Sequence, residues 1–311
     1  MLNETEIIWQ NGKLIPWAEA KIHILSHSVH YGGGAFEGIR FYQTEDGPAI
    51  FRLQDHVERL FFSSNVLKMN LPYTLHEVSE AIIEVVRSNK IECGYIRPIA
   101  FYGYGKMGVN PVGNPVELFI ACWPWGAYLP HDAIDVKISS YIHVHPDSTV
   151  VQAKLCGHYV NGILASLEIQ GTPYHEALFV DSNGFITEGV GENFFMVKNG
   201  IIHTPKLGGI LPGITRDTII RLARDLNLQV LERDIPVNEV YEADEAFFTG
   251  TAAEVTGIRS IDDRVLGASN QQSITAAIKQ AYFDLVRGKN KALEHYLTYV
   301  NSGQTERQCI G

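Results

Sequence analysis

The sequence predicts an α+β fold in two domains, with antiparallel hairpins and helices in separate stretches of the chain. The chain has 311 residues, more than a single hydrophobic core usually holds, so two domains are expected. Asn-Gly pairs beginning at Asn11, Asn183 and Asn199 lie between short apolar runs and predict tight hairpins. Helical stretches do not alternate regularly with strands, which argues against a doubly wound dinucleotide-binding fold.

The first domain, a small α/β domain, is expected over residues 1–130. Its predicted elements are a hairpin over 7–15, helices over 55–68 and 74–90, and strands over 95–104 and 116–123. Thr74 and Glu77 have the spacing of a capping box, which marks the start of a helix. A turn-rich passage near 124–133 predicts the loop between the domains.

The larger second domain is expected over residues 134–288, and residues 289–311 form a tail without a clear signal. Predicted strands lie at 134–144, 177–180, 185–187, 194–197 and 201–204, with further strand segments around Glu232 and Phe247. Helices are predicted over 159–170, 215–226 and 273–287. The short strands and their Asn-Gly turns predict a meander.

Composition and charge exclude several function classes. The formal net charge is −10, which argues against nucleic acid or a membrane surface as a partner because both require a basic face. No apolar run is long enough to span a bilayer and no secretory signal begins the chain, so a cytoplasmic enzyme is expected. The cysteines are too far apart for a disulfide framework or a zinc site. His143 and His145 are expected to share one face of a strand but lack a third ligand nearby, so no metal site is expected.

Two ionisable residues have surroundings that could support catalysis. Lys154 lies among apolar and small residues, where an isolated ammonium is costly to desolvate. A lowered pKa would make its amine nucleophilic, whereas the alternative is a packed stem with the head group reaching water. Glu188 ends a predicted hairpin strand, and its simple alternative is a solvated carboxylate.

Two stretches predict a binding site for an anion. The run from Leu211 to Arg216 leads into a helix whose first amides could hold a phosphate, although Thr215 could instead cap its own helix. The run from Thr249 to Ala253 is small and hydroxyl-bearing, but it could be an ordinary turn. The Gly-rich run from His30 to Gly38 has neither dinucleotide nor Walker spacing, and alone it indicates a bent loop.

Seven motifs follow one another along nearly the whole chain. They are Tyr31-Gly-Gly-Gly-Ala-Phe-Glu-Gly-Ile-Arg40, Tyr95-Ile-Arg97, Met107-Gly-Val-Asn-Pro111, Ala153-Lys154, Thr187-Glu-Gly-Val-Gly-Glu-Asn193, Leu211-Pro-Gly-Ile-Thr-Arg216 and Gly250-Thr-Ala-Ala-Glu254. Their order resembles the branched-chain aminotransferases, which are fold-type IV pyridoxal-phosphate enzymes. The resemblance implies a two-domain D-amino-acid aminotransferase-like fold, pyridoxal 5'-phosphate as cofactor and self-association as a dimer or an assembly of dimers. It also implies transamination of L-leucine, L-isoleucine or L-valine with 2-oxoglutarate by a ping-pong mechanism.

The same resemblance implies how the cofactor is held. Lys154 would carry the cofactor as a Schiff base, Glu188 would pair with the pyridine nitrogen, and Tyr159 would bond the phenolic oxygen. A carboxylate at the ring nitrogen keeps it protonated, so the ring can accept electrons from the substrate. The phosphate would be bound by Arg59, Ile214, Thr215 and Thr251. Arg59 would otherwise be a routine charge on a helix surface.

The resemblance also places the substrate. Its side chain would lie against Tyr31, Phe36, Val109 and Trp125, with Tyr31 and Val109 supplied by a partner subunit, and Gly38 belongs to the same site. The α-carboxylate would meet Tyr95, Thr251 and Ala252. Arg97 would receive the distal carboxylate of glutamate, because leucine leaves a guanidinium solvated where glutamate pairs with it.

Other functions share part of this pattern. D-amino-acid aminotransferases and aminodeoxychorismate lyases resemble the same Lys and Glu motifs, but Tyr95-Ile-Arg97 and Met107-Gly-Val-Asn-Pro111 favour the branched-chain family. A non-catalytic protein that binds a phosphate ligand would also explain the Gly-rich loop and the helix start. Leu155, Cys156 and His158 depart from the residues associated with the lysine loop of the family, and these departures bear on fine substrate preference.

Overall fold

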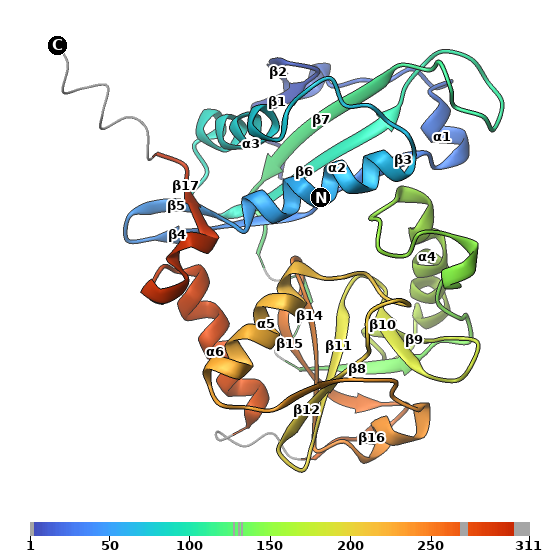
Figure 1. Ribbon diagram of the computed structural model, residues 1–311, viewed down its shortest axis with the longest axis vertical. Helices are drawn as coiled ribbons and strands as arrows, with labels where there is room; N and C mark the ends of the chain where they lie inside the picture. The colour runs from blue at the N-terminus through green and yellow to red at the C-terminus, as the bar shows by residue number, and fades with distance from the viewer. Residues whose placement is uncertain (1–2, 127, 130, 132, 268–272, 302–311) are drawn as a thin grey trace. The chain divides into compact units, whose positions relative to one another are not determined.

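The computed structural model describes residues 3–126, 128–129, 131, 133–267 and 273–301. The chain divides into two compact units, and each combines helices with one large sheet (Figure 1), the mixed α+β class that the sequence predicts. The first unit comprises Met1–Gly126, Ala153–Gly157 and Asp284–Gly311, and the second comprises Ala127–Gln152 and His158–Phe283. Each unit is therefore built from separate stretches of the chain, whereas the sequence suggested one boundary near residue 130.

An eight-stranded sheet organises the first unit. Its order is β17-β5-β4-β6-β7-β1-β2, with β3 paired to β6. The strands are β1 (Ile7–Gln10), β2 (Lys13–Pro16), β3 (Gly34–Phe36), β4 (Ile39–Thr44), β5 (Gly47–Phe51), β6 (Gly94–Tyr102), β7 (Val116–Trp123) and β17 (Leu297–Tyr299). Asn11 and Gly12 have positive φ angles, which the tight turn of the predicted first hairpin requires. Strand β17 pairs with β5, so this part of the tail, for which the sequence shows no clear signal, belongs to the sheet.

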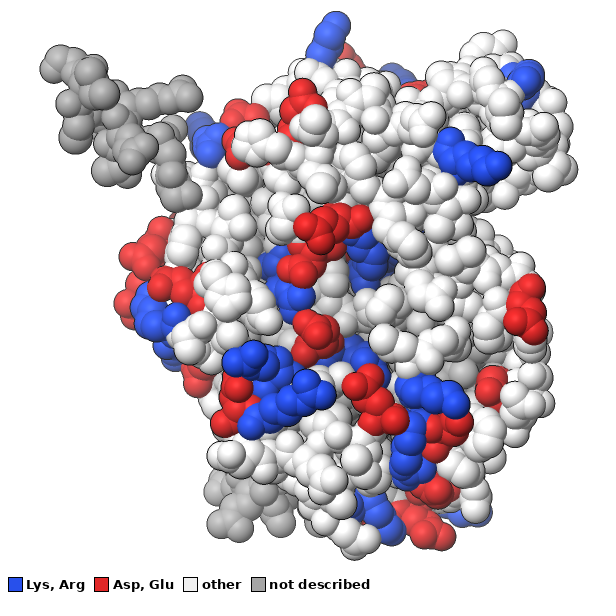
Figure 2. All heavy atoms as spheres, in the orientation of Figure 1, with Lys and Arg blue, Asp and Glu red and all other residues white. Residues whose placement is uncertain are grey.

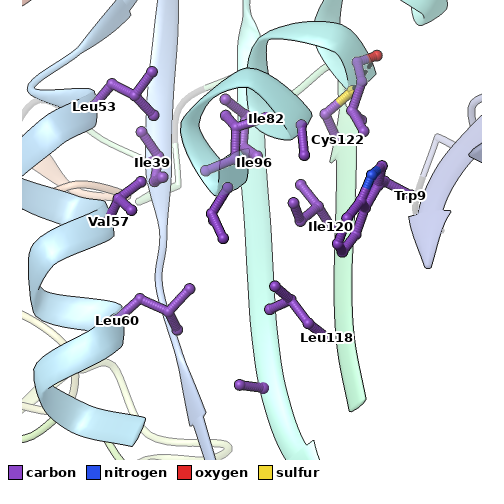
Figure 3. Packing of buried hydrophobic residues seen from close by; sticks show 14 of the residues in the cluster. Trp9, Ile39, Leu53, Val57, Leu60, Ile82, Ile96, Leu118, Ile120 and Cys122 are labelled. Carbon is purple, nitrogen blue, oxygen red and sulfur yellow. Dashed lines mark hydrogen bonds between the residues drawn. The ribbon is translucent and has the colours of Figure 1, made fainter. Parts of the chain in front are cut away.

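Helices α1 (His27–Tyr31), α2 (Leu53–Val66) and α3 (Leu75–Asn89) complete the first unit, with 3-10 turns at Trp17–Glu19 and Lys291–Tyr296. The predicted capping box is present, since the Thr74 hydroxyl accepts from the Glu77 N–H and the Glu77 carboxylate accepts from the Thr74 N–H. Apolar residues from α2, α3 and the strands form one core, and Figure 3 shows Leu53, Val57 and Leu60 of α2 on the side of that helix facing Ile39 of β4. Their spacing of four and three residues places them on one helix face.

A nine-stranded sheet organises the second unit. Its order is β10-β9-β8-β15-β14-β11-β12-β13, with β16 paired to β15, and a further pairing of β10 with β11 closes six strands into a ring. The strands are β8 (Ala133–Ile138), β9 (Glu176–Val180), β10 (Ile186–Gly189), β11 (Asn193–Lys198), β12 (Ile201–Thr204), β13 (Val230–Glu232), β14 (Glu245–Gly250), β15 (Glu254–Ile261) and β16 (Arg264–Val265). Fully buried side chains such as Phe194 and Phe248 form its core.

The second unit also contains α4 (Tyr159–Ile169) and α5 (Ile214–Asp225), and α6 (Ile274–Val286) continues from it into the first unit. Short 3-10 turns occur at Pro146–Ser148 and Val237–Glu242 in the second unit, and a third, at Cys156–His158, spans the division between the units. None of the described helices is long and apolar enough to cross a membrane. On the face drawn in Figure 2, Lys and Arg side chains lie among Asp and Glu, as an acidic chain with local ion pairs would show.

One predicted strand is shorter than expected. Strand β8 ends at Ile138, and residues 139–144 form bends and irregular structure. The Glu168 carboxylate accepts hydrogen bonds from the Ser139 hydroxyl (2.7 Å) and from the Ser140 N–H (3.1 Å), so a side chain replaces the strand partner at this point. The prediction that His143 and His145 share one face of a strand is therefore wrong.

Candidate active site

The main chain at Lys154 is fixed on both sides by elements of the first unit. Its N–H donates to the hydroxyl of Ser63 on α2 (2.9 Å), and its carbonyl accepts from the N–H of Phe36 on β3 (3.1 Å). The next residue, Leu155, forms an isolated antiparallel bridge with Ala35. A side chain that begins from such a backbone has little freedom to move away, which suits a functional group.

The Lys154 amine lies in a desolvated and positively charged setting. The Nζ atom is 5.0 Å from the centroid of the Phe36 ring. Burial lowers the pKa of Lys154, the charges of Arg59 and Arg97 lower it further, and Glu37 acts in the opposite direction. A lower pKa enlarges the neutral fraction of the amine, which is the nucleophilic form.

A buried cluster of charges adjoins the lysine, and sequence reasoning identified only one of its members. The fully buried Glu37 carboxylate accepts from Arg59 Nε (2.6 Å), from a terminal nitrogen of Arg59 (2.9 Å) and from His56 Nδ1 (2.8 Å). Burial by itself would raise the pKa of Glu37, but Arg59 and His56 outweigh it and hold the pKa well below its usual range. Arg59 is thus a largely buried, oriented cation with an 11% exposed side chain, and not a routine charge on a helix surface.

Aromatic side chains and Arg97 lie together in the first unit. Tyr95 and Arg97 are alternate residues of β6, and the Arg97 guanidinium carbon is 4.8 Å from the Phe36 ring centroid and 5.5 Å from that of Tyr95. Arg97 Nε is buried and has no hydrogen-bond partner among the described residues. A Cβ atom at Gly38 would stand 1.8 Å from the Tyr95 hydroxyl, so only glycine leaves room for the tyrosine. Of the predicted substrate residues, these four are brought together.

Trp125 is held by a residue that the sequence did not single out. The Arg40 guanidinium donates to the carbonyl of Gly126 (2.8 Å) and to that of Trp125 (3.4 Å), and it lies 5.9 Å from a Trp125 ring centroid. The Trp125 ring meets Tyr95 almost perpendicularly, with centroids 4.6 Å apart. Arg40 therefore orients the predicted wall of the substrate site.

Tyr31 and Val109 lie on exposed segments of the same unit. Tyr31 ends α1 and is 43% exposed, and Val109 is 76% exposed. His27 Nε2 donates to the carbonyl of Gly108 (3.0 Å), and the His27 and Tyr31 rings are 4.7 Å apart, so the two segments are joined. The role of Tyr31 and Val109 in a partner subunit stays a prediction.

In the second unit, Glu188 is buried, accepts hydrogen bonds from two donors and lies close to a histidine. Its Oε2 accepts from Asn193 Nδ2 (3.0 Å), its Oε1 lies 3.0 Å from His143 Nε2, and the Leu211 N–H bridges both oxygens at 3.2 and 3.3 Å. The alternative of a solvated carboxylate at a strand end is therefore wrong. Asn193 and His143 were not recognised as partners of Glu188 in the sequence.

Asn193 links the predicted cofactor residues of this unit. It pairs with Glu188 across β10 and β11 and with Thr249 across β11 and β14. Its side-chain amide also donates to the Leu211 carbonyl (3.0 Å). A Cβ atom at Gly213 would stand 1.9 Å from Asn193 Oδ1, so glycine is needed where α5 begins. Glu188 and the start of α5 are thereby held on one framework.

The start of α5 has the geometry of an anion site. Gly213 is the N-cap and no side chain caps the helix, so the first-turn amides lack intrahelical partners and Thr215 does not cap its own helix. Thr215 is buried. Thr251 and Ala252 form the turn between β14 and β15, beyond the Asn193–Thr249 pair. Tyr159 is the first residue of α4.

Comparison with known proteins decides the family. The family model described as amino-transferase class IV matches residues 34–261. Over 304 residues the chain is 44% identical to a branched-chain-amino-acid aminotransferase of Pseudomonas aeruginosa, covering 96% of this chain and 99% of that protein. The chain belongs to the branched-chain aminotransferases of class IV.

Solved structures of this family have the same fold. A branched-chain amino acid aminotransferase from T.th., complexed with N-(5'-phosphopyridoxyl)-L-glutamate, superposes with a TM-score of 0.93 at 43% identity, covering 96% of this chain and 100% of that one. The branched-chain aminotransferase of Escherichia coli gives a TM-score of 0.93 at 40% identity, again covering 96% and 100%. The predicted fold-type IV architecture is thereby confirmed.

Proposed function

We propose that this chain exchanges the amino group of L-leucine, L-isoleucine or L-valine with 2-oxoglutarate in a ping-pong cycle, and that Lys154 is its catalytic residue. The observation that carries the proposal is the amine of Lys154, which is desolvated, placed beside Arg59 and anchored through its own backbone. Family membership supplies the reaction class, because branched-chain aminotransferases transfer amino groups.

Pyridoxal 5'-phosphate is the cofactor of this class IV enzyme. When bound, it supplies an aldehyde carbon for amines and a ring that accepts the electrons left by the departing α-proton. The residues present fit such a group. Lys154 offers a neutral amine, the uncapped first turn of α5 offers amides for a phosphate, and Glu188 offers a carboxylate for the ring nitrogen. A carboxylate can accept about four hydrogen bonds, so the donors Asn193 and Leu211 leave capacity for the ring nitrogen.

Each residue then has a definite task. Lys154 accepts the α-proton of the amino acid with its neutral amine. In the other half-reaction it returns a proton to the α-carbon of the 2-oxo acid. Glu188 holds a proton at the ring nitrogen, and Tyr159 bonds the phenolic oxygen. The phosphate is bound by Arg59, by the amides of Ile214 and Thr215, and by Thr251, which combines a guanidinium with a helix N-terminus.

The substrate is recognised by one apolar wall and one cation. Phe36 and Trp125 take the branched side chain, while Tyr95, Thr251 and Ala252 bind the α-carboxylate. Arg97 binds the distal carboxylate of glutamate or 2-oxoglutarate. The buried Nε of Arg97, which has no partner among the described residues, supports this assignment because a buried donor favours an acceptor.

Self-association as a dimer or an assembly of dimers forms part of the proposal. Helix α4 exposes Val160, Ile163, Leu164 and Leu167, whose spacing of three, four and seven residues places them along one face. Apolar stripes of this kind are typical of subunit interfaces. The cytoplasmic location expected from the sequence stays a prediction.

The test is an assay of the purified protein with cofactor, 2-oxoglutarate and a panel of L- and D-amino acids. We expect turnover with the three branched L-amino acids and none with D-amino acids, and activity confined to D-alanine or D-glutamate would contradict the proposal. Lys154→Ala should fold and show no turnover. Lys206→Ala, at an exposed lysine paired with Asp234, should keep full activity. After borohydride reduction and digestion, the cofactor adduct should lie on Lys154.

A further inference from the structure

His143 is the close neighbour of Glu188 that no sequence motif indicated. It lies in the irregular segment after β8, and its N–H donates to the carbonyl of Val180 at the end of β9 (2.9 Å). Its ring packs against Phe179, with centroids 5.6 Å apart, and its Nε2 is 3.0 Å from Glu188 Oε1. Both side chains are close to buried, at 13% and 11% exposure. The ring is therefore fixed by its backbone, by an aromatic neighbour and by the carboxylate.

The two ring nitrogens of His143 have different surroundings. Nε2 lies 3.0 Å from Glu188 Oε1. The Nδ1 atom is buried and has no hydrogen-bond partner among the described residues. Among the described residues, the carboxylate of Glu188 is therefore the polar side chain that the ring contacts.

We propose that His143 is a positioning residue for Glu188, fixing the carboxylate that pairs with the ring nitrogen of the cofactor. This inference rests on the proposed function of Glu188. Asn193 and Leu211 bind the carboxylate from β11 and from the segment before α5, while His143 binds it from the segment after β8. Without His143, Oε1 loses its only side-chain contact among the described residues, and the carboxylate can turn about its last bond.

The experiment compares three variants with the wild-type holoenzyme. His143→Leu removes the imidazole and keeps an apolar contact for Phe179, whereas His143→Gln places an amide N–H near the former Nε2. His145→Asn is the matched control, because His145 is two residues away with a 45% exposed side chain, and asparagine keeps a side-chain acceptor. Single-turnover rates with leucine and visible absorption spectra across pH, with pyridoxal phosphate bound and no substrate, are recorded for each.

We expect His143→Leu to lower the saturating single-turnover rate about tenfold, the lower end for a hydrogen bond to a charged group, with the half-saturating leucine concentration nearly unchanged. The midpoint pH of the change in its visible spectrum should be about half a unit higher than in the wild type, because a less protonated ring draws less charge from the lysine-bound end of the cofactor. His143→Gln should restore most of both properties, and His145→Asn should match the wild type.

Two outcomes would overturn the inference. If His143→Leu keeps the wild-type rate and spectrum, Glu188 needs no third contact. If His143→Gln and His143→Leu lose rate equally and their apoproteins show the same drop in melting temperature, the ring acts through packing on Phe179. Absence of leucine turnover in the wild type would count against the proposed function instead, and the spectra of the bound cofactor would still decide the role of His143.

Discussion

Two buried glutamates, one in each unit, have pKa values displaced in opposite directions. Glu37 in the first unit is fully buried, and Arg59 and His56 outweigh the effect of burial and lower its pKa. Glu176 begins β9 in the second unit and is 5% exposed; burial raises its pKa, and the nearby charge of Glu192 raises it further. Burial alone would raise both pKa values, and only at Glu37 do charged neighbours reverse the direction of the shift.

The same contrast describes how each unit holds its functional group. The first unit gathers ionised side chains around Lys154, so its electrostatics act directly on the amine. The second unit surrounds Glu188 with an amide, a backbone N–H and an imidazole, and none of these three contacts is an arginine or lysine. An arginine or lysine at Glu188 would compete with the cofactor ring for the carboxylate. The Asn193 amide and the Leu211 N–H orient the carboxylate without that competition.

The largest expected effect is on the free energy of unfolding, and it follows from replacing Glu37 by a neutral residue. Burial already favours the neutral form at Glu176. Glu37→Gln keeps the shape but leaves the buried Arg59 cation without its counter-charge. We expect a loss of about 3–5 kcal/mol in the free energy of unfolding at pH 7, the range for breaking a buried ion pair. The measurement is urea unfolding of the apoprotein followed by circular dichroism.

The pH dependence and a surface pair supply the controls for Glu37→Gln. Since the folded pKa of Glu37 is lowered, its stabilisation is present above the unfolded pKa of about 4.5 and is lost as pH falls below it. The difference between wild type and variant should shrink in acid. Glu84→Gln, in a pair with Arg87 whose side chains are 45% and 32% exposed, should cost at most about 1 kcal/mol. Equal losses of unfolding free energy in both variants would show that the buried cluster around Glu37 stabilises the protein no more than a surface ion pair.

Local signals in the sequence predicted most elements of both units. Strands β7 and β12 and the capping box of α3 follow the prediction, because alternation, Asn-Gly turns and cap residues act within a few residues of each other. Strand β17 escaped prediction because Leu297–Tyr299 becomes a strand only by pairing with β5, which is about 250 residues away in the chain. The early end of β8 likewise depends on a distant side chain, that of Glu168.

The site divides in the same way. Motif order indicated Lys154, Arg59 and Glu188, and the structure gives each of them a buried or desolvated setting. Among their supports, Arg40 and Asn193 end two of the motifs without a role assigned to them, whereas Ser63 and His143 belong to no motif; their support of the site is evident only from tertiary contacts. A histidine between two irregular residues has no periodic signal, so the spacing of His143 and His145 suggested only a shared strand face.

The second prediction concerns Arg97, the other cation near Lys154 in the first unit. Arg97→Ala should weaken handling of glutamate and 2-oxoglutarate by about 1.5–3 kcal/mol, the range for hydrogen bonds to charged groups. Leucine should lose far less, because it offers the guanidinium no partner and loses only the stacking of Arg97 on Phe36 and Tyr95. The measurement is kcat/KM for each substrate in separate half-reactions. Equal losses would show that Arg97 binds the shared α-carboxylate or supports the fold.

The smallest expected effect, and the one with the opposite sign, concerns Glu176→Gln in the second unit. Because the folded pKa of Glu176 is raised, the folded protein keeps a proton that the unfolded chain releases, so wild-type stability falls as pH rises above about 4.5 towards the folded pKa. The amide of glutamine does not titrate, and its oxygen can keep the hydrogen bond from the Ala177 N–H (2.8 Å). We therefore expect the free energy of unfolding of the variant to exceed that of the wild type by on the order of 1 kcal/mol between pH 5 and pH 8, measured by urea unfolding.

Glu242→Gln, at a side chain that is 73% exposed, should show no such pH-dependent gain. A difference between Glu176→Gln and wild type that stays constant with pH would mean that Glu176 is ionised in the folded protein, and the contrast with Glu37 would fail.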